Sequence, residues 1–150
     1  MLATSLVACL HFVCAFGIVA TLFFEWLSFS RTPSLQEARR LAMADRWYGI
    51  FAGVLLVVGF IRAYHFEKGW DYYRASPFFH LKLGVFLLMG LLSIYPTIRF
   101  MRWKPELLAG HAPQMSDAQH RLIARCLGAQ MLLLPVLLLA ASLMAHGMGV

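Results

Sequence analysis

A chain of 150 residues is short enough to form a single domain, and 61% of its residues are hydrophobic while only 13% are charged. This hydrophobic fraction, with a mean hydropathy of +0.70, lies well above the roughly 45–50% that is typical of soluble globular proteins, so that class is excluded. The net charge of +6 lies mainly at the ends of apolar runs, which indicates membrane flanks and excludes a nucleic-acid-binding surface.

Four segments are apolar enough to cross a bilayer, which takes about 20 mostly apolar residues. They cover residues 3–29, 46–66, 77–101 and 117–146. We therefore predict an all-α integral membrane protein, with residues 1–150 forming one four-transmembrane-helix bundle. The first segment is too long for the apolar core of a signal peptide and has no Lys or Arg before it, so we expect it to be retained as a spanning helix.

Two capping boxes mark helix starts between these spans. Ser34 precedes Glu37 at the required spacing, and Ser116 precedes Gln119. The first box predicts a short interfacial helix over about 34–43, between the first two spans. The second box predicts the start of the fourth span.

The placement of Lys and Arg predicts the orientation. Nine of these residues lie in or beside the first and third connections, against three around the middle one. Because positive charges stay on the cytoplasmic side, we predict a multi-pass protein of the bacterial inner (plasma) membrane with both termini outside.

Polar groups from four different spans then lie towards the outer side of the membrane. They are His11, Arg62, His65, His80, Lys82 and His146. Hydrocarbon offers such groups no partners, so their convergence predicts a site inside the protein.

Several of these groups allow two interpretations. Lys82 lies about five residues, or ~7 Å, inside the third span, and either reaches outward to the headgroups or pairs with an anion such as a ligand carboxylate. Arg62 and His65 are three residues apart and should share a helix face, where they bind ligand carboxylates or anchor the helix at the interface. His80 and Lys82 are two residues apart and should point in different directions.

Two polar residues lie in the first span itself. His11 is deep in this span and is either a core side chain with satisfied hydrogen bonds, an axial ligand to a haem iron or a proton shuttle. Glu25 lies towards the inner end, and we expect it to form an ion pair with Arg46 or Arg99.

Four short motifs occur in an order that is similar to that of a known enzyme family. They are Ala8–Phe12, Ala38–Leu41, Trp47–Ile50 and His80–Leu83. They resemble the HemJ-type protoporphyrinogen IX oxidases, which use a first-span histidine and a third-span lysine and are associated with haem b. The resemblance implies these roles for His11 and Lys82.

Three further motifs extend a second resemblance over nearly the whole chain. They are Glu67–Trp70, Ser76–Phe79 and Leu92–Phe100. They look like a family of small bacterial inner-membrane proteins, domain-of-unknown-function family 2214. The chain departs from the oxidases at Arg121–Cys126, which lacks the carboxylate that those enzymes carry there, so tetrapyrrole binding is the property we expect it to share with them.

We therefore expect a protein that binds haem b or a porphyrin, and the resemblance implies a redox enzyme related to protoporphyrinogen IX oxidation. His11 and Lys82 would carry the chemistry, Arg62 and Lys82 would bind ring carboxylates, and His65 or His80 would be the second iron ligand beside His11. The expected partners are membrane lipid, the porphyrin or haem and a second copy of the chain, and no nucleic acid. The alternative is a non-enzymatic membrane assembly or interaction subunit, and an oligomeric ion or metal permease ranks last.

Overall fold

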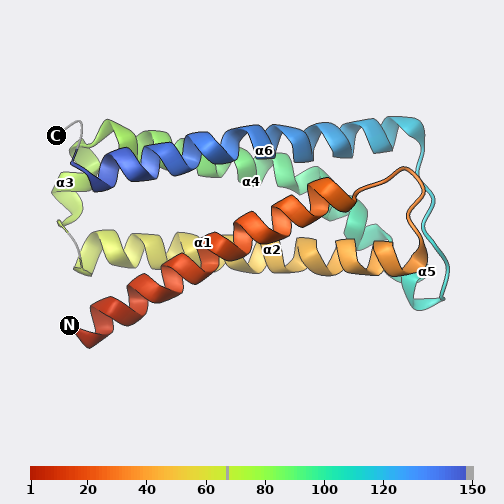
Figure 1. Cartoon of the computed structure of the whole chain (residues 1–150), viewed down its shortest axis with the longest axis horizontal. Helices are drawn as coiled ribbons and strands as arrows, with labels where there is room; N and C mark the ends of the chain where they lie inside the picture. The colour runs from red at the N-terminus through yellow and green to blue at the C-terminus, as the bar shows by residue number, and fades with distance from the viewer. Residues whose placement is uncertain (67, 148–150) are drawn as a thin grey trace.

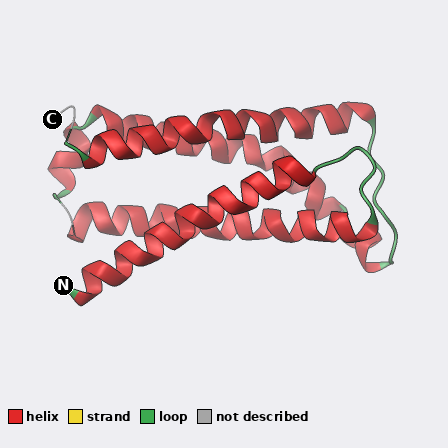
Figure 2. Ribbon diagram, in the orientation of Figure 1, coloured by secondary structure: helices red, strands yellow, loops and turns green. Residues whose placement is uncertain are grey.

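The computed structural model describes residues 1–66 and 68–147 and shows a bundle of long helices (Figures 1 and 2). The four long helices are α1 (Leu2–Ser28), α2 (Leu35–Ile61), α4 (Pro77–Arg102) and α6 (Asp117–Ala145). Each belongs to a segment that is long and apolar enough to cross a membrane, and the described residues contain no strand. The prediction of an all-α four-spanning bundle is confirmed.

Three short helical elements connect the long ones. The π-helix η1 (Arg62–Phe66) continues α2, α3 (Trp70–Ala75) precedes α4, and α5 (Lys104–Leu108) follows it. Glu67, which belongs to one of the motifs noted in the sequence, lies outside the described residues.

The long helices form two antiparallel pairs, since α1 packs mainly against α2 and α4 mainly against α6. The start of α1 and the end of α6 lie at one end of the bundle together with α3, and we call this the terminal end (Figure 1). The α1–α2 and α4–α6 connections lie at the opposite end, which we call the connection end.

The first capping box is present, but the helix it starts is longer than predicted. The Ser34 hydroxyl accepts a hydrogen bond from the Glu37 backbone N–H at 3.2 Å, and the Glu37 carboxylate accepts one from the Ser34 N–H at 2.7 Å. The separate interfacial helix over 34–43 was wrong, because one continuous helix runs from Leu35 to Ile61. The expected break contains neither Gly nor Pro, so nothing in it interrupts the backbone hydrogen bonds.

The connection end is tied together by contacts between segments far apart in the sequence. The second capping box is present at Ser116 and Gln119. Next to it, the Arg31 guanidinium donates to the Asp117 carboxylate at 2.7 Å. The Phe29 ring stacks on His120 with the ring centroids 5.2 Å apart.

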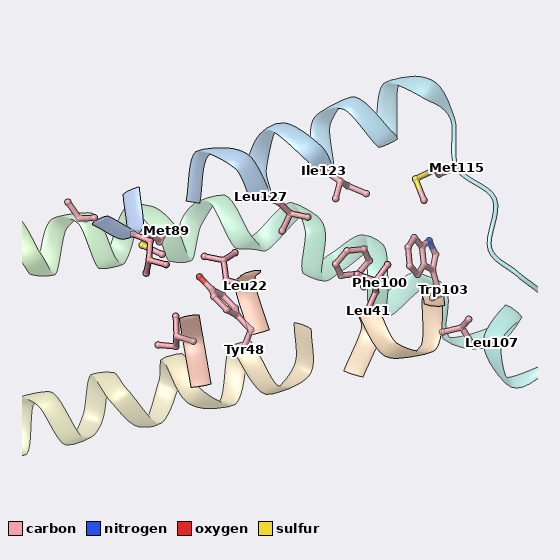
Figure 3. Packing of buried hydrophobic residues seen from close by; sticks show 14 residues of the cluster. Leu22, Leu41, Tyr48, Met89, Phe100, Trp103, Leu107, Met115, Ile123 and Leu127 are labelled. Atoms are coloured by element: carbon pink, nitrogen blue, oxygen red, sulfur yellow. The ribbon is translucent and has the colours of Figure 1, made fainter. Parts of the chain in front are cut away.

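Most of the buried apolar side chains lie in the connection half of the bundle. Figure 3 shows this cluster, which includes Leu22, Leu41, Tyr48, Met89, Phe100, Trp103, Leu107, Met115, Ile123 and Leu127. The terminal end has a smaller buried cluster of Ala63, Tyr73 and Phe79. The terminal half is therefore less completely packed, and this is where the cavities lie.

Candidate functional site

Two adjoining cavities lie between the helices in the terminal half of the bundle. The larger has a volume of about 580 Å³ and the smaller about 140 Å³. They share lining residues from all four long helices, namely His11, Gly59, Phe79, Lys82 and Ala141. We call the larger one the polar chamber and the smaller one the apolar chamber.

The polar chamber is lined by cationic side chains from three elements. Arg62 comes from η1, Lys82 from α4, and Lys68 from the segment before α3. Aromatic rings lie near two of them: the Arg62 guanidinium carbon is 5.8 Å from the centroid of the Phe12 ring, and Lys82 Nζ is 5.8 Å from that of Phe79. These cations are groups that can bind an anionic part of a ligand.

The apolar chamber extends the same space towards the middle of the bundle. Beyond the shared residues, its walls are aliphatic and aromatic and include Leu55, Leu83, Phe86 and Leu137. A molecule that occupied both chambers would place an anionic part beside the cations and an apolar part among these side chains.

The structure brings together three of the five residues predicted to bind a ligand. His11, Arg62 and Lys82 are half-buried and line the polar chamber. His65 and His80 are exposed and line neither chamber, and the His80 ring Nε2 lies 2.8 Å from the Arg74 carbonyl oxygen. The roles assigned to these residues stay predictions.

The π-helix explains why Arg62 and His65 do not share a face, as an α-helix would have required. A π turn closes its hydrogen bonds from residue i to i+5 and is therefore wider than an α turn. In η1 this width brings Arg62, Ala63 and Phe66 to the polar chamber and leaves Tyr64 and His65 exposed.

Gly17 sets how closely α1 approaches α2, and Gly59 lies beside the chambers. A Cβ added at Gly17 would lie 2.5 Å from Cδ2 of Phe51, so only glycine fits there without a shift of the ring. A Cβ added at Gly59 would lie 3.7 Å from Cε1 of His11, which is an ordinary contact. Gly59 therefore places the α2 backbone directly beside the His11 ring.

A second polar group of side chains lies in the connection half, where it is enclosed by the apolar core. The Tyr48 hydroxyl donates to Gln130 Oε1 at 2.7 Å, and the Thr97 hydroxyl donates to the Asp45 carboxylate at 2.7 Å. Glu25, Asp45 and Tyr48 act on one another electrostatically. We call these five residues, which come from all four long helices, the acidic cluster.

The predicted ion pair of Glu25 is wrong. Among the described residues Glu25 forms no salt bridge with Arg46 or Arg99. Arg46 is exposed, and the Arg99 side chain instead donates to the Tyr95 hydroxyl at 3.2 Å. Glu25 faces inward because it follows Ile18 and Leu22 on the buried stripe of α1.

The sequence of the chain matches the model of one protein family, over residues 3–149, and that family is described as "Predicted membrane protein (DUF2214)". The chain belongs to this family. No curated protein and no solved structure matches the DUF2214 chain. The resemblance to the HemJ-type oxidases therefore gains no support from these comparisons.

Few side chains of this DUF2214 protein are placed so that they could bind a metal ion together. Among residues 1–66 and 68–147 no three His, Cys, Asp or Glu side chains come together as a metal site. His11 is the single imidazole that lines the polar chamber in this part of the chain. A metal there would need most of its ligands from a larger molecule, as iron does in a porphyrin.

Sequence reasoning missed most of the walls of the two chambers. Phe79 entered the sequence analysis only as part of a motif, and neither Tyr73 nor Ala141 was singled out there. A small residue such as Ala141 in a leucine-rich span was the one available signal, since it leaves room beside its helix.

Proposed function

We propose that this DUF2214 protein binds an amphipathic molecule with carboxylate groups, of the porphyrin class and foremost haem b, in the two chambers. The observation that carries the proposal is the position of His11, Arg62 and Lys82 around one space with apolar walls. These three side chains come from α1, η1 and α4, so the fold and not one local motif brings them together.

The size and chemistry of the space support a ligand of this class. Pockets for small molecules and cofactors have volumes of about 300–1,000 Å³, and the polar chamber at about 580 Å³ lies in this range. Ring carboxylates would bind Arg62 and Lys82, and the apolar macrocycle would pack against residues such as Leu83 and Phe86.

His11 is the residue that would hold an iron porphyrin. Its ring lines both chambers beside Gly59, which places an imidazole where the macrocycle would lie. A bound haem b would supply one-electron chemistry, while the protein would contribute the axial nitrogen and the cations that hold the propionates.

The proposal is tested by titrating detergent-purified protein with free-base protoporphyrin IX and, separately, with haemin. We expect saturable binding of both. Lys82→Met should lower the affinity for both ligands about 10- to 100-fold, because a hydrogen bond to a charged group contributes about 1.5–3 kcal/mol. His11→Ala should abolish the Soret shift of haemin and affect free-base porphyrin much less, since only the iron needs the imidazole.

Two matched variants serve as controls. Lys104→Met removes an exposed cation at the connection end, and His80→Ala removes an imidazole that lines neither chamber. Both should bind like the unmodified protein. A loss of affinity that is equal in Lys82→Met and Lys104→Met, or no saturable binding of either porphyrin, would contradict the proposal.

A role in membrane assembly is the second candidate, and the outer face of α2 favours it. Gly49 and Gly53 are exposed, and an added Cβ at either position would meet no atom within 4 Å. Small residues on a lipid-facing surface let a second helix approach closely. If Gly49→Leu dissociates an oligomer while His11→Ala and Lys82→Met leave function unchanged, this second candidate is correct.

A further inference from the structure

The acidic cluster in the connection half contains two carboxylates inside the apolar core. The Glu25 side chain is 2% exposed and Asp45 is 5% exposed. They lie near enough to each other to interact electrostatically. Buried carboxylates are normally balanced by a basic side chain, because an uncompensated charge is expensive in an apolar surrounding.

Charge compensation from the protein is missing at this point. Among the described residues neither Glu25 nor Asp45 forms a salt bridge. The titratable groups that interact here are Asp45 and Tyr48 from α2, and α6 contributes the neutral Gln130, whose amide donates to the Cys126 carbonyl. On α4, Arg99 is bonded to Tyr95 instead.

The described hydrogen bonds of the cluster leave one fully buried carboxylate oxygen without a donor. The Thr97 hydroxyl is used by Asp45 and the Tyr48 hydroxyl by Gln130, each at 2.7 Å. Glu25 Oε1 is buried and has no hydrogen-bond partner among the described residues. An ionised carboxylate in that position would have neither a counter-charge nor a donor for this oxygen.

We infer that the acidic cluster is a proton-binding site, in which Glu25 holds one proton as a neutral acid and Asp45 is the ionised partner. The assignment follows from the contacts, because Asp45 has the Thr97 hydroxyl as a donor whereas Glu25 Oε1 has none. The proton binds and leaves by protonation of a carboxylate oxygen, with no redox step. This inference does not depend on the ligand proposed for the chambers.

The arrangement couples the proton to helix packing. Glu25 belongs to α1 and Asp45 to α2, so loss of the proton would place two like charges across the interface between these helices. Because the cluster lies in the connection half, it would exchange its proton with the solution on that side of the membrane.

Infrared spectroscopy of the unmodified protein at neutral pH tests the inference, because a protonated carboxyl group has a C=O band separate from those of carboxylates. We expect one such band from a buried group, which exchanges slowly in D₂O. Labelling all glutamates with ¹³C at the side-chain carboxyl carbon should shift it completely, and labelling all aspartates should leave it in place. This labelling needs no substitution and therefore does not depend on a variant that folds.

Two variants locate the proton on one residue. Glu25→Gln should lose the band, while Glu106→Gln, which changes an exposed glutamate in α5, should keep it. The inference is overturned if the unmodified protein has no such band, if the band follows the aspartate label, or if it survives in Glu25→Gln. Replacing sodium and potassium by a large organic cation should change neither band nor stability, and a change in either would assign the site to a metal cation instead.

Discussion

Replacing Gly17 by alanine tests the packing that positions α1 against α2. The added Cβ would lie 2.5, 2.6 and 2.7 Å from Cδ2, Cε2 and Cγ of Phe51, whereas carbon atoms in contact prefer about 3.5–4.0 Å. Cγ is attached to the root of the side chain, so the clash is not relieved by moving only the far end of the ring. The two helices have to separate, or Phe51 has to leave its rotamer.

The expected cost follows from two opposing effects. Overpacking of this kind costs about 1–3 kcal/mol, and the higher helix propensity of alanine offsets up to about 1 kcal/mol of it. We expect Gly17→Ala to lower the free energy of unfolding by about 1–2 kcal/mol, as measured by reversible unfolding in mixed detergent micelles.

A matched control and a rescue make the result decisive. Gly53 is an exposed glycine of α2, and an added Cβ there would meet no atom within 4 Å. We therefore expect Gly53→Ala not to lower the free energy of unfolding. Shortening the ring in Gly17→Ala/Phe51→Leu should recover part of the loss. If Gly17→Ala is as stable as Gly53→Ala, the close approach of α1 and α2 described here is wrong.

Three further changes probe contacts between the helices, each by the same unfolding measurement. Tyr48→Phe removes the 2.7 Å hydrogen bond to Gln130 and should cost about 0.6 kcal/mol, the average for hydrogen bonds between membrane helices, and no more than about 1.7 kcal/mol. Ser116→Ala removes the N-cap of α6 and should cost about 1 kcal/mol, with Ser116→Thr close to the unmodified protein. Arg31→Ala removes an exposed ion pair and should cost little stability, with the difference shrinking at high salt.

Hydropathy was sufficient to predict the fold because each span satisfies its own backbone hydrogen bonds. Both capping boxes follow from local sequence, and the structure confirms them at Ser34 and Ser116. The separate helix over 34–43 was wrong, because the polar residues Asp45 and Arg46 do not interrupt α2. Asp45 is accommodated inside this helix because its carboxylate accepts a hydrogen bond from Thr97 of α4. Local sequence does not reveal such a partner.

The candidate site was predictable only in part, for a related reason. The depth of His11, Arg62 and Lys82 along their helices placed them at one level, and the structure shows that they line one chamber. Their rotation about the helix axes was less certain, because a π turn in η1 changes which residue faces inward. His65 was therefore grouped with Arg62 on α-helical geometry that this segment does not have.

The chambers and the acidic cluster are separated by a packed apolar layer, which determines how they can act. His11 and Glu25 are 14 residues apart on α1, or ~21 Å, and the buried side chains between them include Ile18 and Leu22. The hydroxyl of Thr21 is bonded to the Gly17 carbonyl at 2.7 Å. Along the described part of α1, no chain of polar side chains therefore links the two sites.

The same separation predicts that each site works without the other. Effects of distant sites with no shared partners add to within about 0.3–0.5 kcal/mol, so Glu25→Gln should change porphyrin affinity by no more than about twofold. Lys82→Met should likewise leave the infrared band of Glu25 in place. A large change in porphyrin affinity in Glu25→Gln, or in the infrared band in Lys82→Met, would contradict this independence. It would mean that the apolar layer around Ile18 and Leu22 transmits a rearrangement between the two ends of the bundle, which would then have two conformations.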